Sequence, residues 1–594
     1  MSHRRDQSIV PNSNYRRTTF LARASSELGV PGLSADVKAN YVREDAKNRP
    51  RVSDAPGNPN YVTALMPPSM DVEILSPGWV GNNKFNEQLV TNSIFVTNPY
   101  WAVNRFSNTD TDDRLSGFVQ LQYDIGAGIT LQGRGELSTY WTNRRTIEPY
   151  GTNYIPGGSL DDTEYHISEY NYSFQASTTQ SLTSNISLSA RLGGNIRQER
   201  TKILGQTGTN FNIPGLRTIQ NTSNQSPIYD FSRSEVWSAY GTADISYKDY
   251  AYLNLSGRND IASTLPVDNN SYFYPSASGS FVFSEAFDVP DWLSFGKVRG
   301  AWGYVGGDTS PYQLNLTYEL TGHSHTNPNG TGVPVGQIAT GSVPNAELEP
   351  SKKETIEAGL ELGFFSDRVT FDFTWYRETT TDDIVPTTIP STSGYTSRIL
   401  NVGKTRNTGI EVSLRTTPIQ TGDFEWDLNI NFSQNNNEVL RITEDLNQLQ
   451  LSQPRSRQAF VRAREGEPYG AIMAYKYKRD DQGRLILDSN GLPQRRDSLT
   501  VAGHFPPDWR GGITNTFRYK GFVVEALLDV QKGGSIYSGT NEVATANGLH
   551  AQTLRGREQG YVKVSGVDAN GNPTTARVSP QTYWGRISTI SNEF

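Results

Sequence analysis

Apolar and polar side chains alternate strictly along residues 118–141, FVQLQYDIGAGITLQGRGELSTYW. The alternation stops at the short glycine turn 126–128 and then resumes in the same phase. Successive side chains of a β-strand point to opposite faces, so this pattern predicts a β-hairpin with one apolar and one polar face. The two faces must meet different environments.

The same alternation recurs along most of the chain. It surrounds the turns LTSN, KDY, FSDR, TPIQTGD and YKG and, more weakly, LGVPG and SEAFDVPDWLSF. The pattern predicts about eight hairpins, or about sixteen strands, most of them near the ~10 residues that cross a bilayer at a tilt. Aromatic residues gather at the strand ends, as in Tyr140-Trp141 and Trp375-Tyr376. Such aromatic girdles are typical of bilayer interfaces.

The connections between hairpins are long, polar and rich in Gly, Asn, Pro and Thr. We expect loops at 42–114, 142–170, 197–234, 305–353, 377–408, 433–508 and 531–582. Short turns at one end and long loops at the other are typical of an outer-membrane barrel with periplasmic turns and extracellular loops. A soluble sandwich has short links at both ends, and a propeller shows a blade-length repeat that we do not find here. The predicted fold is an all-β transmembrane antiparallel β-barrel.

In that barrel the apolar face meets lipid and the polar face lines a hydrated lumen. A lumen inside sixteen or more strands is too wide for side chains to fill, so it must be a channel or contain a plug. Closing the barrel removes the unpaired strand edges that lipid cannot solvate.

Composition supports this interpretation and excludes several others. Hydrophobic residues make up only 35% of the chain, yet 30 Tyr, 24 Phe and 10 Trp concentrate the apolar surface in rings. The absence of cysteine excludes disulfides, thiolate metal sites and cysteine nucleophiles. A net charge of −7 without a basic field argues against a nucleic-acid partner. We find no signal peptide and no run of ~20 apolar residues, which excludes only helical membrane proteins.

Five phrases resemble, in order, those of the SusC/RagA-like TonB-dependent outer-membrane transporters of Bacteroidetes. They are LSGRNDIASTLPVDNNSYFYPSASGSFVFSEAF (255–287), NAELEPSKKETIEAGLELGFFSDRVTFDFTWYRETTTDDIV (345–385), NVGKTRNTGIEVSL (401–414), EGEPYGAIMAYKYKRDDQGRLILDSNGLP (465–493) and FPPDWRGGITNTFRYKGFVVEALLDVQKGGSIYS (505–538). Near the start, VPNSNYRRTTF and NRPRVSDAPGNPNY also look like family sequence. The resemblance covers nearly the whole chain.

The resemblance implies a barrel of about 22 strands around an N-terminal plug, a TonB-binding segment and a SusD-like surface lipoprotein as a lid. It implies uptake of oligosaccharides or peptides across the bacterial outer membrane, driven through TonB. We find no plug or TonB box before the first strands, and family members usually continue beyond YWGRISTISNEF. We therefore expect residues 1–594 to be a partial barrel domain that lacks the plug and the last strands and does not transport by itself.

Two other classes of function remain open. A passive porin or a surface adhesin could use the same barrel, and a soluble glycan-binding or glycan-degrading β-protein could share the alternation. We find no GxSxG, HExxH or P-loop motif, so we do not expect an enzyme. We expect no cofactor.

Aromatic residues in the loops are the candidates for contact with a sugar substrate. Sugar rings stack on aromatic faces, and Asp, Asn and Arg side chains hold the hydroxyls. The candidates are Trp79, Trp101, Tyr150, Tyr154 and Trp509. For any single residue we favour the alternative that it belongs to a girdle or packs a loop.

Three groups of polar residues have the composition of metal sites, and the sequence favours none of them. Asp480, Asp481, Asp488 and Asn490 resemble part of a calcium loop, but the bidentate Glu is missing and two glycine turns explain them. We interpret Asp110, Asp112 and Asp113 as a solvated loop, and His323 and His325 as loop residues without a carboxylate ligand set. The terminal Phe594, with Ile590 in phase, suggests an outer-membrane C-terminal signal, although a fragment that happens to end at Phe is the simpler account.

Overall fold

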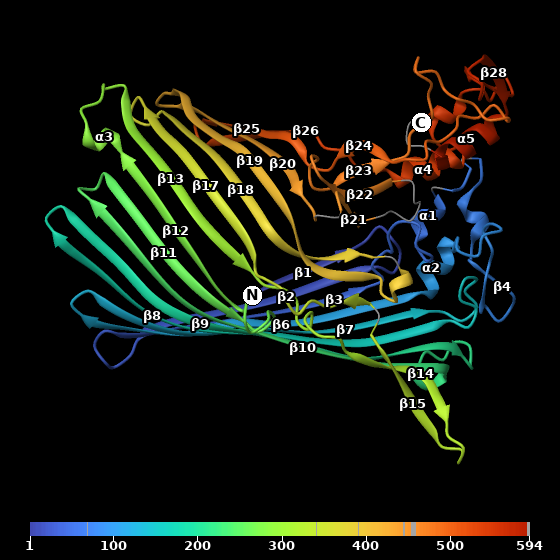
Figure 1. Cartoon of the computed structure of the whole chain (residues 1–594), viewed down its shortest axis with the longest axis horizontal. Helices are drawn as coiled ribbons and strands as arrows, with labels where there is room; N and C mark the ends of the chain where they lie inside the picture. The colour runs from blue at the N-terminus through green and yellow to red at the C-terminus, as the bar shows by residue number, and fades with distance from the viewer. Residues whose placement is uncertain are drawn as a thin grey trace.

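The computed structural model describes residues 1–63, 65–67, 69–339, 341–389, 391–443, 446–452 and 459–590. One sheet of 18 strands dominates it and curves into a wall (Figure 1). Its long strands follow one another in chain order as antiparallel neighbours. They are β1 (Ser2–Gln7), β2 (Asn14–Glu27), β3 (Leu33–Lys47), β6 (Ser107–Gly126), β7 (Ile129–Glu148), β8 (Ser159–Thr183), β9 (Ile186–Phe211), β10 (Thr222–Tyr247), β11 (Ala251–Ala262), β12 (Ser271–Val282), β13 (Leu293–Gly307), β17 (Ser351–Phe364), β18 (Val369–Thr388), β19 (Ser397–Gln420), β20 (Phe424–Arg441), β25 (Pro507–Tyr519) and β26 (Phe522–Gly533).

The alternation in the sequence sets the two faces of this wall. In the β6–β7 pair, Gln120 lies opposite Arg134, and Val119 lies opposite Gly135 on the other face. Large side chains of the apolar phase stand free, with Phe174 58% and Leu192 71% exposed. These side chains form the outer surface predicted to meet lipid, and the polar phase forms the inner surface.

Short turns join the strands at one end of the wall, which we call the turn end. Residues 127–128 connect β6 to β7, residues 248–250 connect β10 to β11, and residues 520–521 connect β25 to β26. At the first of these turns Gly126 has φ 87° and Gly128 has φ 70°. A side chain is strained in this left-handed region, so the glycines allow the chain to reverse within two residues.

The strands extend much further toward the opposite end than the sequence pattern predicted. β8 has 25 residues, and β9 and β10 have 26 each. The expected loops 142–170, 197–234 and 377–408 therefore shrink to the connections 149–158, 212–221 and 389–396. Beyond the lipid both faces of a strand meet water, so alternation disappears while the backbone ladder continues, as between Asp383 and Val402.

The end opposite the turns, which we call the loop end, carries the small helices and strands (Figure 1). Most of the buried core lies there as well. The first connections carry α1 (Pro59–Thr63), η1 (Val72–Leu75), β4 (Trp79–Val80), β5 (Asn86–Glu87), α2 (Pro99–Arg105) and η2 (Ile219–Asn221). Later connections carry β14 (Tyr318–Thr326), β15 (Gly332–Ile338), β16 (Ser342–Val343), η3 (Ser391–Ser393), β21 (Gln448–Ser452), β22 (Ala459–Arg464), β23 (Ala471–Ala474) and β24 (Thr500–His504). The segment after β26 carries α4 (Gly539–Ala546), η4 (Ala551–Leu554), β27 (Val562–Val567), β28 (Pro573–Val578) and α5 (Pro580–Ile590). α3 (Phe283–Ala286) lies instead at the turn end between β12 and β13.

Several apolar clusters hold the loop-end elements together, and two of them show the pattern. One joins Leu487 and Leu492 to Val562, Val564 and Val578, and the other joins Val62, Leu75 and Val96. The wall itself encloses a polar surface, so its apolar side chains face outward. The loop-end elements pack like a small soluble domain built on the ends of the strands.

The wall has two unpaired edges. Within the described residues β1 pairs only with β2, and β26 pairs only with β25. Every residue of β26 is exposed. No helix in the described part of the chain is long and apolar enough to cross a membrane.

Candidate functional site

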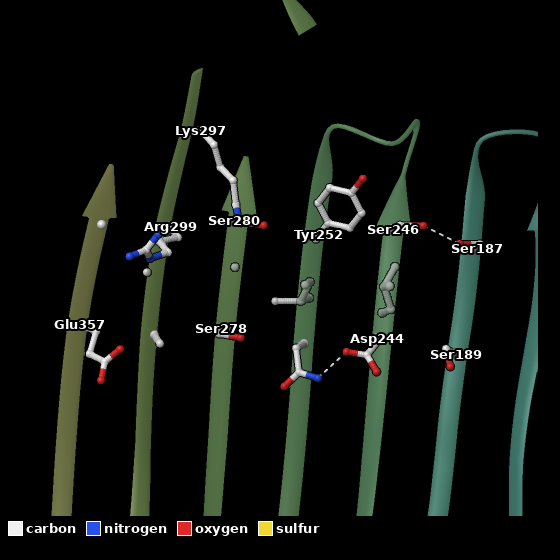
Figure 2. Close-up of a pocket in the computed structure, with 17 residues that line it drawn as sticks. Ser187, Ser189, Asp244, Ser246, Tyr252, Ser278, Ser280, Lys297, Arg299 and Glu357 are labelled. Atoms are coloured by element: carbon white, nitrogen blue, oxygen red, sulfur yellow. Dashed lines mark hydrogen bonds between the residues drawn. The ribbon is translucent and has the colours of Figure 1, made fainter. Parts of the chain in front are cut away.

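The polar face of the wall contains a cavity of about 480 Å³ near the turn end. Figure 2 shows its lining on six neighbouring strands, from β9 to β17. Serines, one asparagine and two carboxylates lie in the lining together with apolar and small residues, and several of the polar side chains contact one another across the strands. Asn254 donates to Asp244, and the hydroxyls of Ser187 and Ser246 are hydrogen-bonded (Figure 2). Such a surface offers many hydrogen-bond partners.

Small residues keep one side of this cavity open. Arg299 of β13 lies directly opposite Gly359 of β17. A Cβ at Gly359 would come within 2.5 Å of Arg299 Nε and 2.8 Å of its Cγ. The missing side chain therefore lets the arginine lie flat across the neighbouring strand.

Arg299 is the centre of a charge network on three strands. Its Nη1 and Nη2 donate to the two carboxylate oxygens of Asp372 at 3.0 Å each. Nη1 also donates to Glu361, which accepts from Lys297 Nζ at 3.2 Å. Nη2 donates to Thr374 Oγ1 at 2.5 Å. Two cations and two carboxylates balance here, and the bidentate pair fixes the guanidinium plane.

A second cluster on the polar face lies further toward the loop end. Arg258 Nε donates to Asp260 Oδ1 at 2.8 Å and to Tyr274 Oη at 2.7 Å. The rings of Tyr272 and Tyr274 are stacked, with centroids 5.9 Å apart, and Arg258 lies over the ring of Tyr240 at 5.9 Å. Aromatic faces next to a fixed arginine and carboxylate are suited to a ligand that carries both rings and hydroxyls.

Trp79 and Trp101 lie at the loop end, and both are close to one arginine. Arg105 stands 4.5 Å from the ring centroid of Trp79 and 5.7 Å from that of Trp101. Asn98 caps α2 by accepting from Tyr100 N, which fixes this short helix. Trp101 is only 1% exposed, and its Nε1 donates to Thr152 Oγ1 at 3.0 Å. Loop packing, the alternative given above, describes Trp101 in this structure.

Tyr150 and Tyr154 belong to the same block of loops. Tyr150 packs against the apolar cluster that contains Ile147. Tyr154 Oη accepts from Arg51 Nη1 at 3.2 Å, and Arg51 Nη2 donates to Glu148 Oε1 at 2.6 Å. Burial, followed by the nearby Glu148 carboxylate, raises the pKa of Tyr154. The structure thus brings four of the five candidate aromatics into one region.

Trp509 is separate from that group. It lies on β25, opposite Lys532 of β26, and its ring centroid is 5.8 Å from that of Phe432. Phe432 belongs to the apolar phase of β20, so Trp509 extends the aromatic surface at that end of the wall. Contact of these five residues with a sugar stays a prediction.

The acidic and histidine groups occupy places that the sequence did not predict. Asp110, Asp112 and Asp113 lie on β6 and not in a loop, because the polar residues there continue the strand ladder. Their carboxylates are engaged: Asp110 lies 3.3 Å from Arg49, and Tyr41 Oη donates to Asp113 at 2.5 Å. His323 and His325, also predicted in a loop, lie on β14.

The glycine turns proposed for the 480–491 segment are present. Asp480 Oδ1 accepts from Arg484 N, and Asp488 Oδ1 accepts from Leu492 N. Gly483 and Gly491 take φ 79° and 76°. Within the described part of the chain no group of three or more His, Cys, Asp or Glu could hold a metal ion. Phe594 lies outside the described residues.

Sequence reasoning did not identify the inner-wall clusters. Arg299, Glu361 and Asp372 all stand in the polar phase of predicted strands, so the signal was present. Only the strand register shows that the three meet, because Glu361 pairs with Asp372 and with Lys297 on its other side.

Comparison with known proteins matches this architecture. The profile of the family described as "TonB dependent receptor-like, beta-barrel" matches residues 69–572. TonB-dependent receptor P26 of Formosa agariphila is 28% identical over 353 residues, which make up 54% of this chain and 34% of that receptor. TonB-dependent receptor SusC of Bacteroides thetaiotaomicron is 29% identical over 219 residues, 36% of this chain and 21% of SusC. The matched segments thus span about a third or less of these relatives.

The fold has solved counterparts. The structure of the RagAB peptide transporter covers 90% of this chain with a TM-score of 0.71 at 18% identity, and 60% of that chain is matched. The RagAB peptide importer in its closed-closed state gives a TM-score of 0.68 at 19% identity, with 88% of this chain and 58% of that chain covered. At such identities the likeness concerns the fold.

An antiparallel wall with an apolar outer face and a polar inner face is the architecture of an outer-membrane barrel. The chain belongs to the TonB-dependent receptor-like β-barrel family, and the resemblance to its SusC/RagA-like members is confirmed. It is an outer-membrane protein, and its family consists of receptors and not of enzymes.

Proposed function

We propose that this chain forms the barrel wall of a nutrient importer that takes up oligosaccharides by a TonB-dependent route. The observation that carries the proposal is the polar inner wall, where the Arg258–Tyr274 and Arg299–Asp372 clusters line a barrel whose outer face is apolar. A path for hydroxyl-rich cargo through lipid needs such a surface. Peptides are the second cargo class, suggested by the fold shared with the RagAB peptide transporter.

We propose that the complete receptor contains further strands and an N-terminal plug. The two unpaired edges support this, since backbone groups at an open sheet edge are not satisfied in lipid. The limited share of the relatives that this chain matches supports it as well. Residues 1–594 would then be part of the barrel domain.

We propose two protein partners for that receptor. A SusD-like lipoprotein would cover the loop end, where the small folded elements gather (Figure 1). TonB would act from the turn end, through a segment outside this chain. Both rest on the similarity to SusC and RagAB.

The test is uptake of labelled oligosaccharides by cells that carry the full-length receptor. We expect uptake that stops when TonB is deleted, and a heat-modifiable band in the outer-membrane fraction. Tyr274→Phe removes the hydroxyl that bonds to Asp260 and Arg258 and should slow uptake, whereas Tyr250→Phe, in the β10–β11 turn, should not. Equal uptake with and without TonB would instead support a passive porin, and surface binding without uptake would support an adhesin.

A further inference from the structure

Three arginines from distant parts of the sequence converge at the loop end. Arg105 ends α2, Arg145 lies near the loop end of β7, and Arg217 lies in the connection between β9 and β10. Arg217 Nη2 donates to the carbonyl oxygen of Arg105 at 3.0 Å, and Arg145 Nη2 donates to the carbonyl oxygen of Arg217 at 2.7 Å. We call this group the arginine cluster.

The positive charge of the arginine cluster is not balanced by the protein. Among the described residues neither Arg105 nor Arg217 forms an ion pair, and Arg145 reaches only Asp162, at 3.7 Å between two half-exposed side chains. Burial, followed by repulsion from Arg105 and Arg145, lowers the pKa of Arg217. Like charges held together in a partly buried site destabilise it unless an anion joins them.

The cluster also has unused hydrogen-bond donors. A guanidinium group has five N–H donors, and the backbone contacts above use one from Arg217 and one from Arg145. Arg105 Nε is buried without a partner. Trp79 lies under the Arg105 guanidinium at 4.5 Å and holds its plane in place. Donors that are already oriented bind a planar or tetrahedral oxyanion with little loss of side-chain entropy.

We propose that the arginine cluster binds an oxyanion group, a carboxylate or a sulfate, carried by an acidic oligosaccharide at the outer mouth of the barrel. The cluster lies at the loop end, which faces the outside in this fold, so cargo meets it before it reaches the inner wall. The carrier identity rests on the proposed function, whereas the anion site itself depends only on the three arginines.

The test is calorimetric titration of the full-length receptor in detergent micelles at constant ionic strength. The probes are sulfate, acetate, an oligogalacturonate, a sulfated oligosaccharide and a neutral oligosaccharide of equal length. We expect the acidic oligosaccharides to bind at least about tenfold tighter than the neutral one. The ratio between the carboxylated and the sulfated probe tells which oxyanion the site prefers.

Two variants separate this site from general surface charge. Arg217→Gln should abolish the preference for the acidic probes, and Arg217→Lys should restore part of it, because lysine keeps the charge but not the fork. Arg484→Gln is the control, since it removes a loop arginine already paired with Asp480 at 2.7 Å. Circular dichroism and the heat-modifiable band establish that each variant folds.

Equal affinity for acidic and neutral probes would overturn the proposal, as would an equal loss in Arg217→Gln and Arg484→Gln. Preferential binding of free sulfate and acetate without any preference among the oligosaccharides would overturn the assigned carrier. Failure of the proposed function would give a different result. The receptor would still prefer anionic probes, but uptake in cells would not depend on TonB.

Discussion

Arg299 and Arg217 show how differently one residue type can be used in the same barrel. On the inner wall Arg299 is held by Asp372 and Glu361, and Lys297 completes a balanced group of four charges. At the loop end Arg217 has cationic neighbours, Arg105 and Arg145, and no carboxylate of the described residues forms an ion pair with it. The first arrangement stabilises the wall, and the second leaves binding capacity for something outside the protein.

The difference follows from what each position has to do. Neighbouring strands place Arg299 beside its partners by register, so the network forms as the sheet forms. The arginine cluster is assembled by separate segments that contact each other through backbone carbonyls. Unbalanced charge at the mouth of a barrel is a cost to the empty protein that a ligand can remove.

Arg299→Gln tests the comparison with the largest expected effect on stability. It leaves Asp372 and Glu361 with Lys297 as the one remaining cation of the network. Hydrogen bonds to charged groups contribute about 1.5–3 kcal/mol each, so we expect the free energy of unfolding to fall by about 2 kcal/mol in this half-exposed setting. Urea unfolding in lipid vesicles measures it. A change near zero would show that the network does not stabilise the wall.

Gly359→Ala should have a smaller effect through the same network. The added Cβ would collide with the Arg299 side chain and weaken its bidentate pair with Asp372. We expect a loss of about 1 kcal/mol by the same unfolding measurement. Gly300→Ala is the matched control, because its Cβ would lie 3.7 Å from the nearest atom, Glu357 O, an ordinary contact. Equal effects of the two substitutions would contradict the role assigned to Gly359.

Arg51 offers an intermediate case, since it is paired but lies at the loop end. The folded pKa of Tyr154, which it contacts, is raised above the unfolded value of about 10. The stabilisation linked to this proton is therefore fully present below pH ~10 and is lost as pH rises through the folded pKa. The measurement is the absorbance of tyrosinate during a pH titration of the parent protein and of Tyr154→Phe. The difference between the two curves should show that Tyr154 loses its proton at a higher pH than the exposed tyrosines do. A midpoint near pH ~10 would contradict its buried contact with Glu148.

The smallest expected effect is that of Arg217→Gln on stability without a ligand. The substitution removes repulsion but also the bond to the Arg105 carbonyl, so the free energy of unfolding should change by less than about 0.5 kcal/mol. Thermal unfolding at low salt measures it. A loss comparable to that of Arg299→Gln would mean that the two arginines are both structural and that the comparison fails.

The hairpins were predictable because one chemical requirement acts on every second residue. From Val119 to Trp141 the alternation gave strands, turn and faces as the structure has them. Beyond the lipid that requirement ends, so residues such as Asp162 and Arg145 looked like loop although they pair in the β7–β8 ladder. The sequence therefore predicted the strands near the turn end, but it did not predict how far they extend toward the loop end.

The side-chain clusters could not be predicted for a different reason. From the sequence, Trp101 could contact a sugar or pack a loop, but its hydrogen-bond partner Thr152, 51 residues away in sequence, could not be predicted. Arg105, Arg145 and Arg217 carry no shared motif, and only the folded loops bring them together. Contacts between remote segments depend on register and packing, which no local pattern encodes.

The length of β8, β9 and β10 has a consequence for whatever approaches the cell from outside. A strand of 26 residues spans roughly 85 Å along its axis and, at a tilt of about 40°, roughly 65 Å of height, whereas the apolar band of a barrel is only ~25 Å tall. Much of the wall therefore stands clear of the membrane as rigid, hydrogen-bonded sheet. An antibody or a phage fibre would meet the rigid surface of an antiparallel sheet there. A variant that escapes such recognition would have to change side chains while keeping the register of the strands intact.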